Sequence, residues 1–542
     1  MRWFVGVLVL AACAKPRPPE PPKPEPTPVV DIVPELAIVQ PERGVFVEGG
    51  TLVVTGRAHD DAAVRVTVNG VDATVAPDGS FTATLDVPAG LTILETHAID
   101  TTGHDVRDVR SVLVGPFAPS DARAPIAVRL GRGGLAALGK ALGASAKSID
   151  VKAAARALNP VFDNGGCLGA RADIADLSIG KVEVSLAPKA GAVATMIFVD
   201  SIVARFDVRY EVACLGGSTT MTVHTNARIT SDLGATVRGG RLQTTLANTN
   251  VALEALQMEI SGVPGPIENL LRRALRGSVE HALQTIVAND VPPVANAKLA
   301  SLLAHPAQPP VLGRPVKLEV VPRRFEVTAS GVLVAADAAF VVAGGERGRH
   351  VAKPASMPGL EHPPVDADVW IAAAAIDQLL SGLWAAHAFD RTLALADLGM
   401  VGMLLKGKLH TIEVAFSLPP MIGATKHLEL AIGDLILTAR DATGAELQRF
   451  AVSLRSDLTI EPGEHALATT EPTVLAQQLG NGPGPLDAAT VEAIAKTVWS
   501  LVAMMVDDSL TRIPVPALGG GVQVRAATAR DEFVVLDISA SE

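Results

Sequence analysis

The residue types best suited to catalysis in this sequence are not arranged as any enzyme motif. No His-Glu-x-x-His zinc motif, Walker loop or Gly-x-Ser-x-Gly nucleophile elbow occurs in the 542 residues. Gly131-Arg132-Gly133-Gly134 precedes a predicted helix, but it lacks the spacing of a dinucleotide-binding turn. His59, His97 and His104 lie near one another in sequence, and we interpret them as surface histidines. The sequence therefore predicts no catalytic site, no cofactor and no metal site.

The first cysteine, Cys13, lies where a lipid could be attached. A short positive start is followed by the apolar run Trp3–Leu10, which is too short to span a bilayer. Leu10-Ala11-Ala12-Cys13 resembles the lipobox of bacterial lipoproteins. The resemblance implies that residues 1–13 hold a signal with its lipobox, cut before Cys13, which then carries acyl chains such as palmitate and anchors the protein to a membrane. The alternative is an ordinary secretory signal with an incidental cysteine.

Residues 14–30 are predicted to form a proline-rich tether. Pro16–Pro28 is mostly proline, a composition that builds no core and prefers an extended polyproline conformation. At about 3.1 Å per residue this segment reaches about 40 Å, enough to hold a folded body clear of lipid headgroups. The residue after the lipobox cysteine is Ala14 rather than aspartate, which in the lipoprotein family implies sorting to the outer membrane. We therefore expect an outer-membrane lipoprotein of a bacterial cell envelope, facing either the periplasm or the surface.

The other two cysteines, Cys167 and Cys214, are candidates for one disulfide. An exported chain meets an oxidising compartment, and two cysteines remain once Cys13 is lipidated. The alternative is two separate buried thiols.

Composition limits the classes of partner. A hydrophobic content of 48% over 542 residues is enough for several cores. The net charge is -11 and no long basic run is present, whereas nucleic acid demands clustered Lys and Arg. We therefore expect no nucleic-acid partner.

Residues 31–118 are predicted to form a small β-sandwich. Alternating apolar residues in Thr51–Thr55 and Val64–Val68 indicate strands, and Asn69-Gly70 and Asp78-Gly79 supply tight turns. This pattern resembles bacterial immunoglobulin-like modules, which mostly act as spacers. Carboxylates near the turns could bind calcium, but we favour solvated loop carboxylates because no complete ligand loop is present. These carboxylates are Asp60, Asp61, Asp100 and Asp105.

The rest of the chain contains one pattern twice. Pro264–Glu268 opens an amphipathic stretch that ends at Val291–Pro293, and Pro483–Asp487 opens a second. Each stretch predicts a long helix, and each is followed by a strand, a turn and another strand. The repetition predicts a duplicated unit, which we divide into residues 121–315 and residues 316–542.

The order of elements along both repeats resembles the bactericidal/permeability-increasing and lipopolysaccharide-binding protein family. The best stretches are Val369-Trp370-Ile371 with the following helix that contains Trp384, and the tail Val522–Leu536. The resemblance implies a tandem tubular lipid-binding fold of the α+β class, mostly antiparallel β. Each half would be a strongly curved antiparallel sheet around long helices, with a tube for acyl chains. Cys167 and Cys214 do not lie where the family places its disulfide, and the cationic tip of some members is not evident, so we expect no bactericidal activity.

Apolar side chains of the predicted helices are the candidates to line these tubes. Burying one CH₂ is worth about 0.8 kcal/mol, so a chain of roughly 16 carbons offers on the order of 12 kcal/mol before association costs. Apolar walls alone can therefore bind an acyl chain of phospholipid or lipopolysaccharide. The lipid-contact candidates are Leu135, Leu138, Leu142, Leu271, Leu275, Val279, Leu283, Ile376, Leu379, Leu383, Trp384, Val498 and Leu501. The alternative is that these side chains form a solid core, in a non-enzymatic interaction or adhesion lipoprotein.

Overall fold

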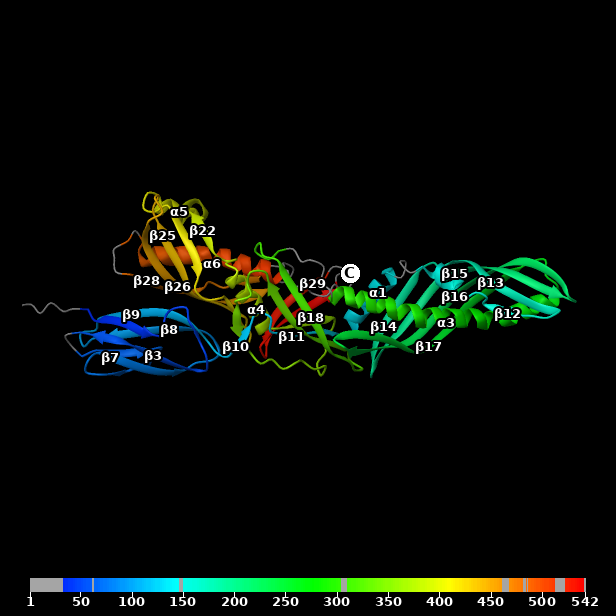
Figure 1. Ribbon diagram of the computed structural model, residues 1–542, viewed down its shortest axis with the longest axis horizontal. Helices are drawn as coiled ribbons and strands as arrows, with labels where there is room; N and C mark the ends of the chain where they lie inside the picture. Colours follow the sequence, from blue (N-terminus) through cyan, green and yellow to red (C-terminus); the bar gives the residue numbers. More distant parts are fainter. Residues whose placement is uncertain are drawn as a thin grey trace, which may run out of the picture.

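The computed structural model shows an elongated protein built from four parts (Figure 1). A β-sandwich lies at one end beside a curved sheet, a central sheet occupies the middle, and a longer curved sheet with the helix α3 forms the other end. The structure describes residues 33–60, 63–145, 150–303, 310–460, 467–480, 484, 486–511 and 522–540. Cys13 and the predicted tether lie outside these residues. Within them, no helix is long and apolar enough to cross a bilayer.

The sandwich has the two sheets and the tight turns that the sequence predicts. Its strand orders are β1-β3-β7-β6 and β2-β9-β8-β4-β5. Burial alternates along β3, as expected when one face of a strand packs in a core. Asn69 and Gly70 have φ values of 48° and 79°, which suit the two-residue turn between β4 and β5. The strands are β1 (Glu35–Gln40), β2 (Phe46–Val47), β3 (Thr51–His59), β4 (Arg65–Val68), β5 (Val71–Asp72), β6 (Thr74–Val75), β7 (Ser80–Asp86), β8 (Gly90–Ile99) and β9 (Asp105–Val114).

The longest strands belong to the first curved sheet, in the order β12-β13-β15-β16-β17 with β14 paired to β15. β15, β16 and β17 contain 21, 24 and 20 residues. Their pairing shifts register at bulges, which bend strands and increase their twist. The elements of this part are α1 (Arg132–Ser145), α2 (Val151–Arg156), β12 (Phe162–Asn164), β13 (Leu168–Ser178), β14 (Val182–Lys189), β15 (Ala192–Val212), β16 (Leu215–Arg238), β17 (Arg241–Ile260) and α3 (Gly265–Leu303).

Helix α3 continues past Val291–Pro293, where the sequence predicts its end. Proline removes an N–H donor and usually interrupts a helix. Here the neighbouring strand β17 holds the proline turn. Thr244 Oγ1 donates to the Pro292 carbonyl at 3.4 Å, and Thr244 N donates to Asn296 Oδ1 at 2.8 Å. The predicted end of the helix is wrong because these contacts are not local in sequence.

The central sheet joins the two repeats. Its strand order is β18-β19-β11-β21-β30-β29, and all pairs are antiparallel. The adjacent strands β11 and β21 each lead into a helix, a curved sheet, a long helix and a hairpin that returns beside the starting strand. The topology therefore contains the duplicated plan predicted from the sequence. The strands are β11 (Ala124–Leu130), β18 (Val316–Val327), β19 (Val332–Val342), β21 (Ala367–Ala372), β29 (Val522–Arg530) and β30 (Phe533–Ala540).

The second curved sheet has the order β22-β23-β25-β26-β27, with β24 paired to β25 and β28 to β26. Every residue of α4 from Ala373 to Leu383 is buried. Together the parts confirm the predicted fold class, a sandwich followed by two antiparallel curved sheets with long helices. The remaining elements are β10 (Phe117–Pro119), β20 (Arg349–Val351), α4 (Ala373–Ala385), β22 (Arg391–Ala394), η2 (Leu395–Leu398), α5 (Gly399–Leu405), β23 (Thr411–Phe416), β24 (Met421–Gly423), β25 (Glu429–Arg440), β26 (Glu446–Ile460), β27 (Leu467–Thr469), β28 (Thr473–Leu479) and α6 (Ala488–Thr511).

The sandwich is fixed to the second curved sheet (Figure 1). Asp434 of β25 lies 3.2 Å from the Arg43 guanidinium and accepts a hydrogen bond from Ser111 N at 3.0 Å. The hydroxyls of Ser111 and Ser453 are 2.7 Å apart. A small apolar cluster packs across the same contact; its buried members are Leu91, Leu113, Val351, Leu418, Met421 and Ala431. The module is thus docked through buried contacts rather than spaced away from the body.

Candidate functional site

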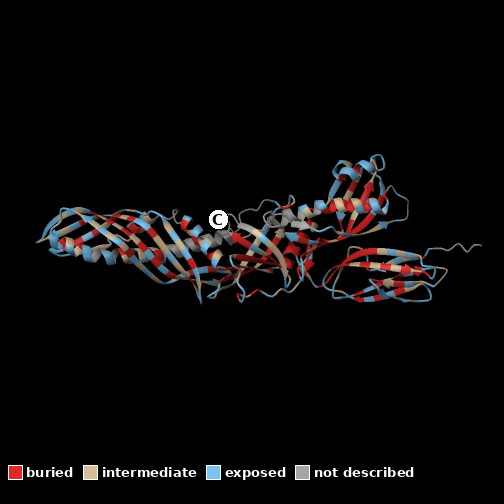
Figure 2. Cartoon of the chain, turned by 180° about the vertical axis from the view of Figure 1, so that it is seen from behind, coloured by how far each residue is buried: buried red, intermediate tan, exposed pale blue. Residues whose placement is uncertain are grey.

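The apolar side chains of the two repeats form two separate interiors among the described residues. The larger one, here the central interior, joins the central sheet, α1, α4, α6 and the second curved sheet. The smaller one, here the α3 interior, lies between α3 and the first curved sheet. Figure 2 shows dense burial through the middle of the molecule and alternating burial along the long strands of the first curved sheet.

The central interior is packed as a core. Its buried side chains outnumber the partly buried ones by more than two to one. The candidates Ile376, Leu379 and Leu383 of α4 are 1%, 1% and 0% exposed, and Val498 of α6 is 2% exposed. These four side chains therefore contact other protein side chains in a closed environment.

The α3 interior is sealed less completely. Among the residues that the structure describes, it has as many partly buried as buried apolar side chains. Leu271 and Val279 of α3 are buried and Leu283 is partly buried. Covering partly exposed apolar side chains with further apolar surface is favourable, because it removes their surface from water. Of the two described interiors, this one therefore has the larger share of apolar surface that is still in contact with water.

The structure places the other candidates elsewhere. Leu135, Leu138 and Leu142 of α1 belong to the central interior, not to the α3 interior. Trp384 donates from Nε1 to the Phe416 carbonyl at 2.8 Å, and its ring lies 5.9 Å from that of Phe46 in the sandwich. The side chains of Leu275 and Leu501 lie outside the described residues.

Strand residues of the α3 interior were missed by the helix-based reading of the sequence. Partly buried apolar side chains on the first curved sheet pack against the buried side chains of this interior. They include Val182, Ile197, Val251, Leu256, Met258 and Ile260. Alternation along the long strands is the sequence signal that could have identified them, but it required the correct register.

The predicted disulfide is present. Cys167 and Cys214 are bonded, with Cα atoms 4.2 Å apart. The bond joins the turn before β13 to the turn between β15 and β16, at the outer end of the first curved sheet. Leu168 and Leu215 beside it are 57% and 76% exposed. A cleft of about 640 Å³ lies next to this end, lined in part by Tyr210.

A second cleft, of about 600 Å³, lies over the central sheet. Arg129 and Trp370 contribute to its lining. The Arg129 guanidinium lies 4.8 Å from the centre of the Trp370 ring and is paired with Asp368, with Nη2 and Oδ2 2.5 Å apart. Neither of the two described clefts is lined by a lipid-contact candidate.

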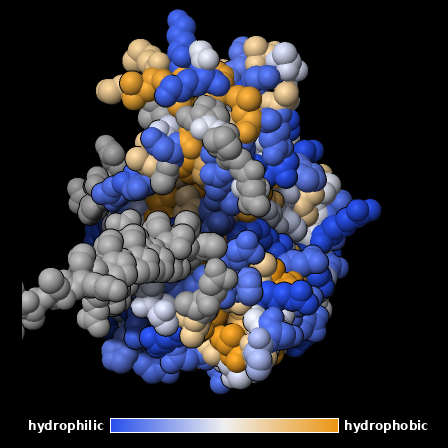
Figure 3. Space-filling model, turned by 90° about the vertical axis from the view of Figure 1, so that its left-hand side faces the viewer, coloured by the Kyte–Doolittle hydropathy of each residue, from blue (hydrophilic) through white to orange (hydrophobic). Residues whose placement is uncertain are grey.

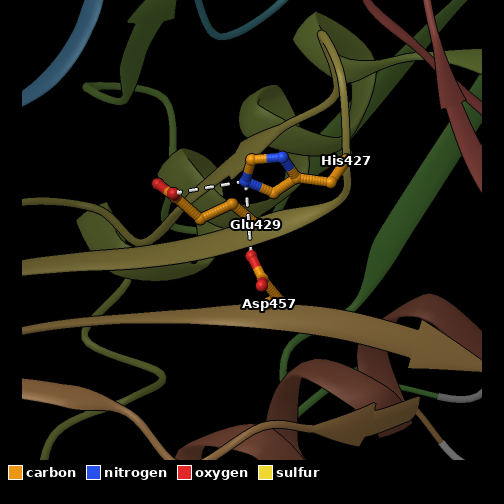
Figure 4. A group of neighbouring side chains, drawn as sticks. All are labelled: His427, Glu429 and Asp457. Atoms are coloured by element: carbon orange, nitrogen blue, oxygen red, sulfur yellow. Dashed lines mark ion pairs between the residues drawn. The ribbon is translucent and has the colours of Figure 1, made fainter.

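Within the described part of the chain, one group of side chains could hold a divalent cation (Figure 4). His427 Nε2 lies 3.3 Å from Asp457 Oδ1 and 3.9 Å from Glu429 Oε2. Glu429 and Asp457 are register partners on β25 and β26, so their side chains share a face. Zn²⁺ accepts imidazole and carboxylate ligands of this kind. However, His427 and Asp457 are 61% and 56% exposed along their side chains, and Arg455 already lies 3.6 Å from Glu429, so an ion-pair network accounts for the contacts.

Asp100 closes a turn in the sandwich rather than offering a calcium ligand. One carboxylate oxygen accepts hydrogen bonds from the amides of Thr102, Gly103 and His104 and from the Thr102 hydroxyl. Desolvation disfavours the charged carboxylate, but these donors outweigh it and hold the pKa of Asp100 well below its usual range. The hydrogen bonds of its own turn therefore already use this carboxylate oxygen.

Comparisons with known proteins support the first module. Residues 34–115 match the family described as glucodextranase, domain B, which covers the sandwich and confirms the predicted immunoglobulin-like module. No curated protein matches the chain. The chain is similar to the crystal structure of lipopolysaccharide binding protein, with a TM-score of 0.41 and 16% identity over 77% of this chain and 99% of that one. It is also similar to the solution structure of latherin, with a TM-score of 0.20 and 15% identity over 32% of this chain and 87% of that one.

Proposed function

We propose that this protein is a non-enzymatic lipoprotein of a bacterial envelope that binds an acyl chain of phospholipid or lipopolysaccharide in the α3 interior. The observation that carries the proposal is the incomplete sealing of that interior, where the partly buried apolar side chains that the structure describes are as numerous as the buried ones. A hydrocarbon chain lying along α3 completes their burial. The gain is about 25 cal/mol for each Å² of apolar surface removed from water.

The polarity of α3 supports this position for the lipid. Leu271 and Val279 face the sheet, whereas Arg272 and Arg276 pair with Glu268 and Glu280 on the outer side, at 2.9 Å and 3.3 Å. The helix therefore separates a polar face in water from an apolar face over the sheet. The apolar face of α3 packs against small as well as large side chains, and the buried alanines of this interior are Ala155 on α2 and Ala170, Ala172, Ala204 and Ala227 on the sheet.

Export and anchoring are supported by the cysteines. The bonded pair Cys167 and Cys214 fits an oxidising compartment, where disulfides persist. Cys13 in its lipobox-like sequence supplies the acylation site, and the extended proline-rich segment after it separates the folded body from the membrane. Mass spectrometry of the membrane-extracted protein tests this part, since an unmodified Cys13 or an intact N-terminus would contradict it.

Native mass spectrometry of the gently purified protein tests the acyl-chain site. We expect a lipid adduct whose mass identifies the chain. Leu283→Trp places a larger ring in the partly buried wall of the α3 interior and is expected to reduce the adduct. Leu138→Trp is the matched control, because Leu138 is partly buried but belongs to the central interior.

The melting temperatures of both variants show whether they remain folded. Loss of the adduct in Leu283→Trp alone supports the proposal. Repeated recovery of lipid-free protein, with no uptake of a fluorescent fatty acid, contradicts it and favours an interaction or adhesion lipoprotein.

A further inference from the structure

A short helix at the outer end of the second curved sheet carries apolar side chains that point into solvent. Met400, Met403 and Leu404 of α5 are 75%, 71% and 73% exposed. Figure 1 shows α5 at the tip of this sheet, and Figure 3 shows hydrophobic surface gathered at the same upper end of the molecule. Clustered exposed apolar side chains mark surfaces that contact another phase or another molecule.

The base of this helix is firmly packed, so fraying of the helix does not explain the exposure of its outer side chains. Leu398, Leu405 and Leu409 are 2%, 2% and 6% exposed and belong to the central interior. The backbone of α5 also lies close against η2, since a Cβ atom on Gly402 would come within 1.7 Å of the Leu395 carbonyl oxygen. Buried leucines thus hold one side of the segment while Met400, Met403 and Leu404 are held out on the other.

Positive charge follows the apolar cluster directly. Lys406 and Lys408 are both exposed and lie within four residues of Leu404, on a chain whose net charge is -11. We propose that α5 with Lys406 and Lys408, here the α5 tip, docks onto a bilayer that contains anionic lipid. The apolar side chains enter the headgroup boundary, and the lysines remain at the surface beside the negative headgroups.

The shape and size of the α5 tip favour a lipid surface over a protein partner. A stable protein interface buries about 800 Å² on each side, more than three side chains on a projecting turn can offer. Insertion of a few apolar side chains beside basic residues is sufficient for reversible attachment to a membrane. The sandwich, which follows the predicted tether, lies at the same end of the molecule as α5 (Figure 1). The inference rests on the proposed envelope location, but not on a chain in the α3 interior.

A fluorophore placed in the tip tests this docking directly. The chain without residues 1–13, which lacks both the apolar signal and the acylation site, carries Met403→Cys, which is labelled with an environment-sensitive nitrobenzoxadiazole dye. The disulfide occupies the other two cysteines. Vesicles of phosphatidylcholine with phosphatidylglycerol are expected to raise the emission and shift it to the blue, and vesicles of phosphatidylcholine alone are expected to do so less. A dye at position 403 that does not respond to either vesicle overturns the proposal.

Matched variants separate the tip from other membrane contacts. Val365 is 81% exposed but lies in the coil before β21, so a dye at Val365→Cys is expected to stay unchanged. An equal response at both positions overturns the proposal. Leu404→Asp and the double variant Lys406→Glu/Lys408→Glu are each expected to weaken vesicle affinity at least about tenfold, which corresponds to about 1.4 kcal/mol.

Lipid-adduct measurements distinguish this proposal from the acyl-chain site. Leu404→Asp is expected to keep the adduct seen by native mass spectrometry, and Leu283→Trp is expected to keep the vesicle response. Unaltered vesicle affinity in Leu404→Asp, with its melting temperature unchanged, refutes docking through the α5 tip whatever the α3 interior contains.

Discussion

Removing the carboxylate of Asp368 is expected to destabilise the joint between the two repeats. Arg129 and Asp368 are register partners on β11 and β21, and their side chains are 7% and 4% exposed. Arg129 Nε also donates to Asp368 Oδ1 at 2.9 Å. In Asp368→Ala the buried guanidinium loses its carboxylate partner and keeps the Gly359 carbonyl, 3.0 Å from Nη1, and the face of the Trp370 ring. Breaking a buried pair by removing one partner costs about 3–5 kcal/mol.

The hydrogen bonds of this pair give a loss of the same size. Two bonds to a charged group contribute about 1.5–3 kcal/mol each. At about 2–4 °C per kcal/mol for a unit of roughly 200 residues, the melting temperature should fall on the order of 10 °C. Differential scanning calorimetry measures this fall, and tryptophan fluorescence in urea gives an independent unfolding curve.

The exposed pair Arg65 and Asp72 supplies the control for this prediction. Their side chains are 67% and 64% exposed, so water screens the pair and its contribution to stability is small. The melting temperature of Asp72→Ala should therefore be close to that of the unaltered protein. Replacing both buried partners, as Arg129→Met with Asp368→Leu, should restore much of the stability because no charge is left unpaired. An Asp368→Ala protein that melts no lower than Asp72→Ala would refute the reasoning.

Two further predictions concern the disulfide and a buried histidine. A disulfide between cysteines 47 residues apart destabilises the unfolded chain by about 4 kcal/mol. Cys167→Ser should therefore speed amide hydrogen exchange in the β15–β16 turn, while exchange in α4 stays slow. Unchanged exchange at the turn would contradict this prediction. Desolvation, with the nearby Lys353 charge, lowers the pKa of His350 to about 4 from 6.5. Because the folded state resists protonation, the stability from His350 is fully present above pH 6.5 and declines toward pH 4, by about 3 kcal/mol in all. His350→Gln should flatten melting temperature against pH over that window, and profiles of equal slope for the two proteins would show that His350 is not responsible.

Local signals account for the features that sequence reasoning predicted correctly. Asn69-Gly70 specifies a two-residue turn by its backbone preferences alone, and the structure has that turn between β4 and β5. The pairing of Cys167 with Cys214 followed from the number of cysteines left in an exported chain. The predicted end of α3 was wrong because Thr244, which is far away in sequence, forms a hydrogen bond to the proline turn. Contacts of that kind leave no trace in helix periodicity.

The candidate site could be predicted only in part, for a related reason. Helical spacing identifies an apolar face but not the sheet that covers it. Leu135 and Leu271 have equivalent patterns, yet Leu135 enters the central interior and Leu271 enters the α3 interior. The difference arises because α1 follows β11 directly, and β11 pairs with β19 and β21 of the central sheet. Strand order, which the sequence does not state, therefore decides which candidates meet.

The two repeats share one topology but fill their interiors differently, and this bears on where the proposed acyl chain would lie. In the second repeat α4 is buried from Ala373 to Leu383, and the rings of Phe389 and Phe416 lie 5.3 Å apart in the same interior. In the first repeat the equivalent helix α1 packs toward the central interior, which leaves α3 to face the curved sheet with many side chains only partly covered. Because protein and hydrocarbon compete for the same volume, the closely packed repeat has less room for a ligand chain. A duplicated fold with two equivalent tubes would bind lipid in both halves. The proposed site lies in the first repeat alone, so Leu283→Trp should reduce the whole lipid adduct and leave no fraction of it that is insensitive to the substitution.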